Sequence, residues 1–420
     1  MKKPFLIALA LSASSFGWVN AQTKTSPAED LVKQASFYIG FYYNGLAKVP
    51  YWRDLQKTML ADVQKLCAGD PKCGYDKGRT VITQAMTALN DPFTRLLSPD
   101  EADTQDRFVD GKGPSTPTIG IQARELPGQG LVVLEAYPGE PAFNADLIRG
   151  NLIKTINGTP ATLAGLKTAE ASKKAMALEY VTAGANKTAS VTPILVEDPR
   201  LPYRTALLGG KALMIRIPHL YGEIGNRVQT NVARAIRDNA AGVIIDLRDS
   251  YSGFDSEALL AAGAFIKDGG FIYDQRFVGQ DSTYSLTNNG GAVSGQPEGG
   301  QARVIAQADR PVQYAGKVVV LVDKVTENSS EMLAYFLQKA GRAQVVGEKT
   351  AGQLGVSGGA IAQLINDDVI QISTYRMLNL DKTPFPMAVT PDVVVPEDLA
   401  SLVAGRDVQL DKALELLGVK

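Results

Sequence analysis

The chain has 420 residues, of which 45% are hydrophobic and 21% charged, and its 43 basic residues nearly balance its 44 acidic ones. This length predicts two or three domains, and this composition is that of a globular protein rather than a disordered or fibrous one. A formal net charge of −1 gives no basic face for nucleic acid, and a single histidine, His219, excludes any site of clustered imidazoles.

The N-terminus has the pattern of a secretory signal peptide at residues 1–21. Lys2 and Lys3 precede an apolar run that starts at Phe5, and Ala21 ends a small-residue cleavage site. The run is too short to span a bilayer comfortably, and no later segment reaches about 18 apolar residues. We therefore expect an exported protein, periplasmic or extracellular, without a membrane span after cleavage. The alternative is a retained N-terminal anchor.

Residues 22–111 are predicted to form a helical region. Leu55, Met59 and Val63 recur at three- or four-residue steps, which aligns an apolar stripe on one helix face. Cys67 and Cys73 flank a Gly/Pro turn, so in an oxidising compartment we expect one local disulfide. A zinc site would need further ligands nearby, and we expect no metal.

Residues 116–199 have the texture of a small β-rich domain. Short β-like runs occur at 118–121, 130–134 and 152–156, and the last of them ends in Asn157-Gly158, a tight-turn signal.

In residues 200–400 strands and helices alternate. The apolar runs 243–247 and 318–322 are each followed by a helical pattern, which predicts a sheet covered on both faces. The Gly- and Asn-rich stretch 288–300 is expected to be an exposed loop, and residues 401–420 a C-terminal helix. The predicted fold class is multidomain α+β.

Polar residues follow two of the buried strands, at 246–253 and at 326–331. In layered α/β domains active groups gather where strands end, and backbone N–H groups at such turns can hold a negative oxygen. The alternative is simple helix capping by Asp, Asn, Ser or Thr.

The order of short motifs along the chain resembles that of the carboxyl-terminal processing (tail-specific) peptidases, which are serine–lysine proteases carrying a PDZ domain. The motifs that carry this resemblance are 89–95, 97–101, 119–121, 138–142, Gly150, 156–158, 246–248, 341–343, 390–392 and 407–410. Each is weak alone, and their collinear order over most of the mature chain is specific.

The resemblance implies a PDZ-like domain at 116–199, a ClpP/crotonase-like peptidase core, no cofactor, and C-terminal polypeptide tails as partners. It places the peptide-binding strand at Thr118, Ile119, Gly120 and Ile121. Such modules add an extended chain end as a strand and hold its carboxylate with backbone N–H groups. The alternative is a degenerate module that serves only as a spacer, because the family's Gly-Asp reads Gly150-Asn151 here.

The catalytic positions depart from the family pattern. The nucleophilic serine, three residues before Glu331, reads Asn328; the base lysine, 25 positions further on, reads Gln353; and the helper glutamine reads Ser357. The N–H groups of Gly253 and Ser329 are the candidate oxyanion donors. An asparagine amide is a poor nucleophile and a glutamine has no basic lone pair, so both halves of the dyad are missing.

Two functions follow from these residues. The leading hypothesis is a catalytically degenerate peptidase homologue that binds polypeptide tails. The alternative is an active serine endopeptidase that uses Ser329 or Ser330 with the displaced Lys349 as its base. A carbohydrate or small-ligand binder has no sequence support beyond a groove, and His219 is expected to be a packed residue.

Overall fold

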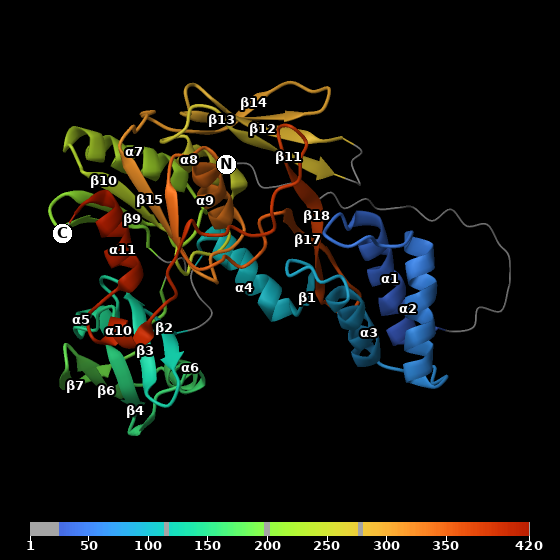
Figure 1. Ribbon diagram of the computed structural model, residues 1–420. Helices are drawn as coiled ribbons and strands as arrows, with labels where there is room; N and C mark the ends of the chain where they lie inside the picture. Colours follow the sequence, from blue (N-terminus) through green and yellow to red (C-terminus); the bar gives the residue numbers. More distant parts are fainter. Residues whose placement is uncertain (1–24, 113–116, 197–201, 276–279, 420) are drawn as a thin grey trace.

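The computed structural model describes residues 25–112, 117–196, 202–275 and 280–419. The predicted signal peptide at 1–21 lies outside these ranges. The described chain has an N-terminal group of helices, a small β module and a central α/β core (Figure 1).

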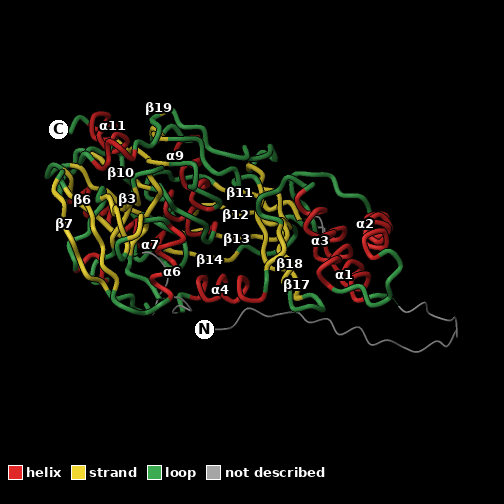
Figure 2. Tube along the Cα trace, turned by 90° about the horizontal axis from the view of Figure 1, so that it is seen from below, coloured by secondary structure: helices red, strands yellow, loops and turns green. Residues whose placement is uncertain are grey.

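The N-terminal region is helical, as its apolar periodicity predicted. Its elements are α1 (Pro27–Tyr42), α2 (Trp52–Cys67), α3 (Tyr75–Thr87), the short strand β1 (Arg95–Leu97) and α4 (Pro99–Asp110). α1 begins with a capping box, in which the Ser26 hydroxyl accepts from the N–H of Glu29 and the Glu29 carboxylate accepts from the N–H of Ser26. A disulfide joins Cys67 to Cys73 after α2. α1, α2 and α3 lie at the end of the molecule opposite the β module (Figure 2).

The β module is one five-strand path with a short side strand. Its strands and helices are β2 (Ile121–Leu126), β3 (Gly130–Ala136), α5 (Pro141–Asn144), β4 (Leu152–Ile156), β5 (Thr159–Pro160), α6 (Leu163–Ala171), β6 (Met176–Thr182) and β7 (Ala185–Val191). The order is β2-β3-β4-β6-β7, with β5 on β4, so β2 lies at an edge. Asn157 and Gly158, both with positive φ, make the predicted turn after β4.

The core contains a mainly parallel sheet covered by helices. Its strands are β8 (Arg204–Leu208), β9 (Ala212–Arg216), β10 (Gly242–Asp246), β15 (Lys317–Val322), β16 (Gln344–Gly347) and β19 (Val393–Val394), in the order β19-β16-β15-β10-β9-β8. The two predicted apolar runs are β10 and β15, neighbours in parallel register. Both are buried along nearly their whole length, which fits a sheet covered on two faces.

A second, antiparallel sheet extends the core toward the N-terminal helices. Its strands are β11 (Gly270–Gln275), β12 (Ser282–Thr287), β13 (Ala292–Pro297), β14 (Arg303–Gln307), β17 (Val356–Gln363) and β18 (Val369–Asn379), together with β1. The expectation of a loop over 288–300 is wrong, because β13 occupies 292–297 and pairs with β12 and β14. Its glycines sit at the tight turn and on a half-exposed strand, so their composition imitates a loop.

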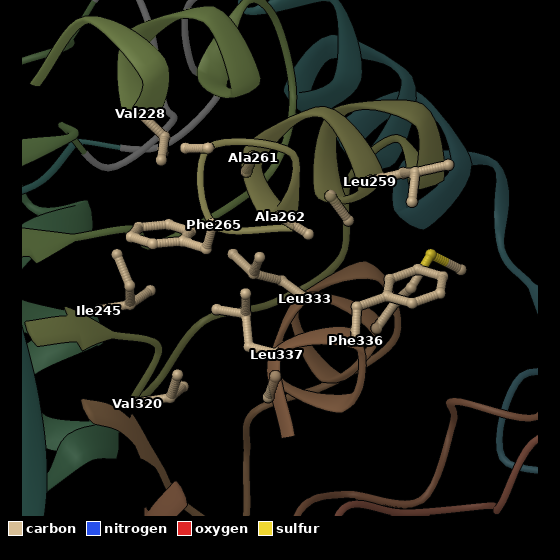
Figure 3. Close-up of a cluster of buried hydrophobic side chains, with 14 of the residues drawn as sticks. Val228, Ile245, Leu259, Ala261, Ala262, Phe265, Val320, Leu333, Phe336 and Leu337 are labelled. Carbon is tan, nitrogen blue, oxygen red and sulfur yellow. The ribbon is translucent and has the colours of Figure 1, made fainter. Parts of the chain in front are cut away.

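Helices α7 (Ile224–Arg237) and α9 (Ser329–Lys339) pack on the parallel sheet, and α8 (Asp255–Ala262) packs on these two helices and on β12, β13 and β14. Figure 3 shows Leu333 and Leu337 of α9 beside Phe265, with Ile245 of β10 and Val320 of β15 on the sheet side. α10 (Leu399–Val403) and α11 (Val408–Leu417) follow β19, so the predicted C-terminal helix is present as α11. In the described ranges, no helix combines the length and apolar character needed to cross a bilayer.

Candidate active site

The turn between β15 and α9 holds Asn328 in a strained backbone conformation. Its φ of 51° and ψ of −119° lie in a region that non-glycine residues rarely adopt, immediately before the first residue of α9. Strain of this kind is kept only where the surrounding structure fixes it, and it clusters at functional sites. A sharp strand-to-helix turn presents the side chain of its apex residue, which is the geometry that a nucleophile uses in hydrolases.

A buried carboxylate brings the two predicted dyad positions together. Glu331, which is fully buried, accepts through Oε2 from the backbone N–H of Asn328 and from that of Gln353, both at 2.9 Å. Its Oε1 accepts from the N–H of Gly352 at 3.0 Å and from the Thr350 hydroxyl at 2.5 Å. Burial raises the pKa of Glu331, and these four hydrogen bonds oppose that rise. The backbone N–H groups of the two carboxamide residues therefore bind the same oxygen atom, Oε2 of Glu331.

The Gln353 side chain points into a cleft of about 530 Å³ and binds a carboxylate there. Its Nε2 donates to Glu327 Oε2 at 2.8 Å, and both residues line the cleft with Tyr251, Ser252 and residues of α4. Burial raises the pKa of Glu327, while Arg95 and the bond from Gln353 lower it. A glutamine amide that donates to a carboxylate is held in place and supplies no base.

The two alternative serines are buried and engaged elsewhere. Ser329 Oγ lies 2.7 Å from Asp255 Oδ1, 2.9 Å from the Gly253 carbonyl and 3.1 Å from Asn328 Oδ1. Ser330 Oγ lies 2.7 Å from Ser250 Oγ, and neither Ser329 nor Ser330 has exposed surface.

Lys349 is exposed, and the structure does not bring it together with either serine. Throughout the described ranges, no lysine ammonium hydrogen-bonds a serine hydroxyl.

Ser357, the predicted helper position, lies on β17, and its hydroxyl helps to lower the pKa of a carboxyl behind the turn. That carboxyl, Asp255, also accepts from Tyr273 at 2.5 Å and from Ser329. Burial raises the pKa of Asp255, and these hydroxyl donors oppose the rise. Ser357 thus belongs to a buried hydroxyl–carboxyl cluster and not to the cleft beside Gln353.

The two candidate oxyanion donors lie on adjacent turns. Leu220 and Gly253 form an isolated parallel β-bridge. In it the Leu220 carbonyl accepts from the Phe254 N–H and the Leu220 N–H donates to the Ser252 carbonyl, so the Gly253 N–H takes no part in the bridge. The Ser329 hydroxyl donates to the Gly253 carbonyl, which joins this turn to the start of α9. Among the described residues, neither the Gly253 nor the Ser329 N–H donates to another backbone carbonyl. The arrangement is capable of polarising a carbonyl oxygen.

His219 is packed, as expected. It is buried, its Nδ1 accepts from the Tyr221 N–H at 3.1 Å, and Phe108 of α4 lies edge-on to it. In the ranges that the structure describes, His, Cys, Asp and Glu side chains form no group of three suited to a metal ion.

The predicted peptide-binding residues precede the edge strand β2. Thr118 pairs with Ile194 in an isolated bridge, Ile119 is fully buried, and Ile121 begins β2. The N–H groups of Ile119 and Gly120 donate to Glu170 Oε1 at 2.8 Å and to Thr118 Oγ1 at 3.0 Å. The sequence did not indicate a role for the side chains of Glu170 and Glu327. Glu170 contacts Ile119, 51 residues before it, and Glu327 contacts Gln353, 26 residues after it, and no local pattern predicts such contacts.

The motifs and the fold of this chain are similar to those of the carboxyl-terminal processing peptidases. Residues 211–395 match the family model of peptidase family S41, which confirms the resemblance seen in the motifs of the chain.

Relatives match over most of the chain. It is 26% identical over 362 residues to a carboxyl-terminal-processing protease of Synechocystis sp., covering 80% of this chain and 76% of that protein. It is 26% identical over 386 residues to the chloroplastic carboxyl-terminal-processing peptidase 2 of Arabidopsis thaliana, covering 86% of this chain and 66% of the relative. A solved structure described as an S41 protease from Bacteroides fragilis has the same fold, with a TM-score of 0.55 at 14% identity over 91% of this chain and 96% of that one.

Proposed function

We propose that this protein is an exported, catalytically degenerate homologue of the carboxyl-terminal processing peptidases that binds the C-terminal tails of unfolded or partner polypeptides. The observation that carries the proposal is the strained turn before α9, which holds Asn328 at the position expected of a nucleophile. The Glu331 carboxylate accepts from the backbone N–H groups of Asn328 and Gln353, which supports Gln353 as the position expected of the base. Neither group performs nucleophilic or general-base chemistry at working pH.

The β module supports the tail-binding half of the proposal. We interpret it as a PDZ-like domain and the core as ClpP/crotonase-like, and its edge strand β2 follows the turn at Thr118–Ile121. An edge strand accepts an added peptide strand through main-chain hydrogen bonds. The disulfide between Cys67 and Cys73 supports export, because disulfides persist in oxidising compartments.

A cleavage assay separates this proposal from an active serine peptidase. We expect the purified mature protein to leave an unstructured, apolar-tailed polypeptide intact, because losing a triad-type nucleophile alone typically costs about 10⁶ in rate. The double variant Asn328→Ser, Gln353→Lys runs beside it. Cleavage by the unmodified protein that Ser329→Ala or Ser330→Ala abolishes would establish the alternative and end the proposal.

Binding is tested separately by fluorescence titration with one peptide in free-acid and amidated forms. We expect the free acid to bind more tightly, because backbone N–H groups favour a carboxylate. Equal affinity of the two forms would remove carboxylate recognition from the proposed function.

A further inference from the structure

The turn that we propose for tail binding already holds a carboxylate of the protein itself. Glu170, near the end of α6, accepts through Oε1 from the Ile119 N–H at 2.8 Å and from the Thr118 hydroxyl at 3.0 Å. The same hydroxyl accepts from the Gly120 N–H at 3.0 Å, so this bond links the carboxylate to a second backbone donor of the turn. The carboxylate of a bound C-terminal tail would accept hydrogen bonds from these same donors.

The strand beside this turn is free to receive a peptide. β2 begins at Ile121 and ends the order β2-β3-β4-β6-β7, and no strand of the described residues pairs with its outer edge. α6 packs against β2, and the Leu163 N–H at its start donates to Glu125 of that strand. Glu170, near the other end of the same helix, therefore reaches the turn that precedes β2.

The surroundings of Glu170 favour displacement of its carboxylate from the turn. It lies in the last turn of α6, where the helix dipole disfavours a negative charge, and its side chain is only partly buried. Burial raises the pKa of Glu170, which the bonds from Ile119 and Thr118 offset only in part. Two carboxylates cannot share one N–H at hydrogen-bond distance without strong repulsion, so occupancy by Glu170 and by a ligand is mutually exclusive.

We propose that Glu170 is an internal ligand that occupies the carboxylate position of the tail-binding turn, and that a bound C-terminal tail displaces it. This inference rests on the proposed function, and it makes Glu170 the residue that sets the affinity threshold for tails. A tail must supply enough strand pairing along β2 to compensate for the bonds that Glu170 gives up. Short tails without such pairing are excluded.

The test compares Glu170→Ala, Glu170→Gln and the unmodified protein with free-acid and amidated forms of one peptide. We expect Glu170→Ala to bind the free acid about tenfold more tightly, because a hydrogen bond to a charged group no longer has to be broken. The amidated peptide is expected to bind with unchanged affinity. Glu170→Gln, which keeps an acceptor without the charge, is expected to fall between the two.

Glu179→Ala is the matched control, since Glu179 is an exposed residue of the same module whose carboxylate accepts from Thr155. It is expected to leave both affinities unchanged. Hydrogen exchange at the Ile119 amide gives a readout that a purely structural role would not reproduce. That amide should exchange faster in Glu170→Ala, and the free-acid peptide alone should protect it again.

The outcomes separate the two claims. If the free acid binds the unmodified protein and Glu170→Ala equally tightly, the internal-ligand inference is overturned and tail binding stands. If neither protein distinguishes the free acid from the amide, carboxylate recognition itself is lost, and the inference falls with it. The isosteric Glu170→Gln keeps the test decisive if the alanine variant folds poorly.

Discussion

At the scale of single residues, the backbone of Asn328 is the most informative feature of the candidate site. A φ of 51° with a ψ of −119° suits glycine, yet the position carries a side chain that is only 8% exposed. Backbone strain of this kind stores about 1–3 kcal/mol. The turn therefore holds a carboxamide, which is a poor nucleophile, in a strained strand-to-helix junction.

Relieving this strain should stabilise the protein. We expect Asn328→Gly to raise the unfolding free energy by about 1 kcal/mol, since released strain exceeds the added flexibility of glycine in the unfolded chain. A thermal unfolding scan should show an increase of a few degrees. Asn328→Ala keeps a Cβ and is expected to give no increase; equal melting temperatures for the two variants would contradict the strain argument.

At the scale of elements, Glu331 ties the start of α9 to the loop that follows β16. Its carboxylate accepts from Asn328, Thr350, Gly352 and Gln353, and it is completely buried. The same carboxylate therefore caps the start of α9 and holds the loop against it. The two carboxamides owe their relative position to it.

Removing this carboxylate should release the loop. Glu331→Ala leaves four donors without this partner, two of them on the buried residues Asn328 and Thr350, so we expect the unfolding free energy to fall by about 3 kcal/mol. Hydrogen exchange should accelerate first at the amides of Gly352 and Gln353. Glu415→Ala is the control, because Glu415 is an exposed helix residue whose carboxylate pairs with Lys412. Unchanged exchange at the two loop amides in Glu331→Ala would show that other contacts hold the loop.

Sequence patterns predicted the elements whose signal is local. β10 and β15 are runs of consecutive Val and Ile, and α2 shows a clear apolar stripe, so each was visible in a short window. β13 was missed because its Gly, Ser and Gln residues gain strand structure from β12 and β14, which no short window contains. Counting from Glu331 indicated positions 328 and 353, whereas the bond from Gln353 to Glu327 depends on side-chain directions that counting does not give.

At the scale of the whole molecule, buried ion pairs join the β module to the core. Arg124 of β2 pairs with Asp249 and Glu397 and lies 3.8 Å from Asp323. Nearby, Arg149 pairs with Asp407, which also binds Arg248. These partners lie more than 100 residues apart along the chain, so no sequence pattern predicted them. The sequence indicated the two parts of the molecule but not how they are joined.

The Arg124 contacts predict a pH-dependent loss of stability. Burial, with the neighbouring charge of Asp249, raises the pKa of Asp323 to about 6 even while Arg124 is present. Arg124→Ala removes the cation beside Asp323 and Glu397 and leaves Asp249 only the more distant Arg216 at 3.8 Å, so we expect the unfolding free energy at pH 7 to fall by about 3 kcal/mol. Because the folded state then binds a proton more readily than the unfolded state does, part of this stability should return as the pH falls below about 6.

Urea denaturation of Arg124→Ala and of the unmodified protein at several pH values between about 5 and 8 measures this difference. Arg107→Ala is the control, because Arg107 and Asp103 form an exposed pair one turn apart on α4, worth less than about 1 kcal/mol. We expect the Arg124→Ala deficit to shrink as the pH is lowered and the Arg107→Ala deficit to stay small throughout. A deficit in Arg124→Ala that is the same at every pH would mean that packing, and not the charge of Asp323 and Asp249, is what Arg124 supplies to the junction.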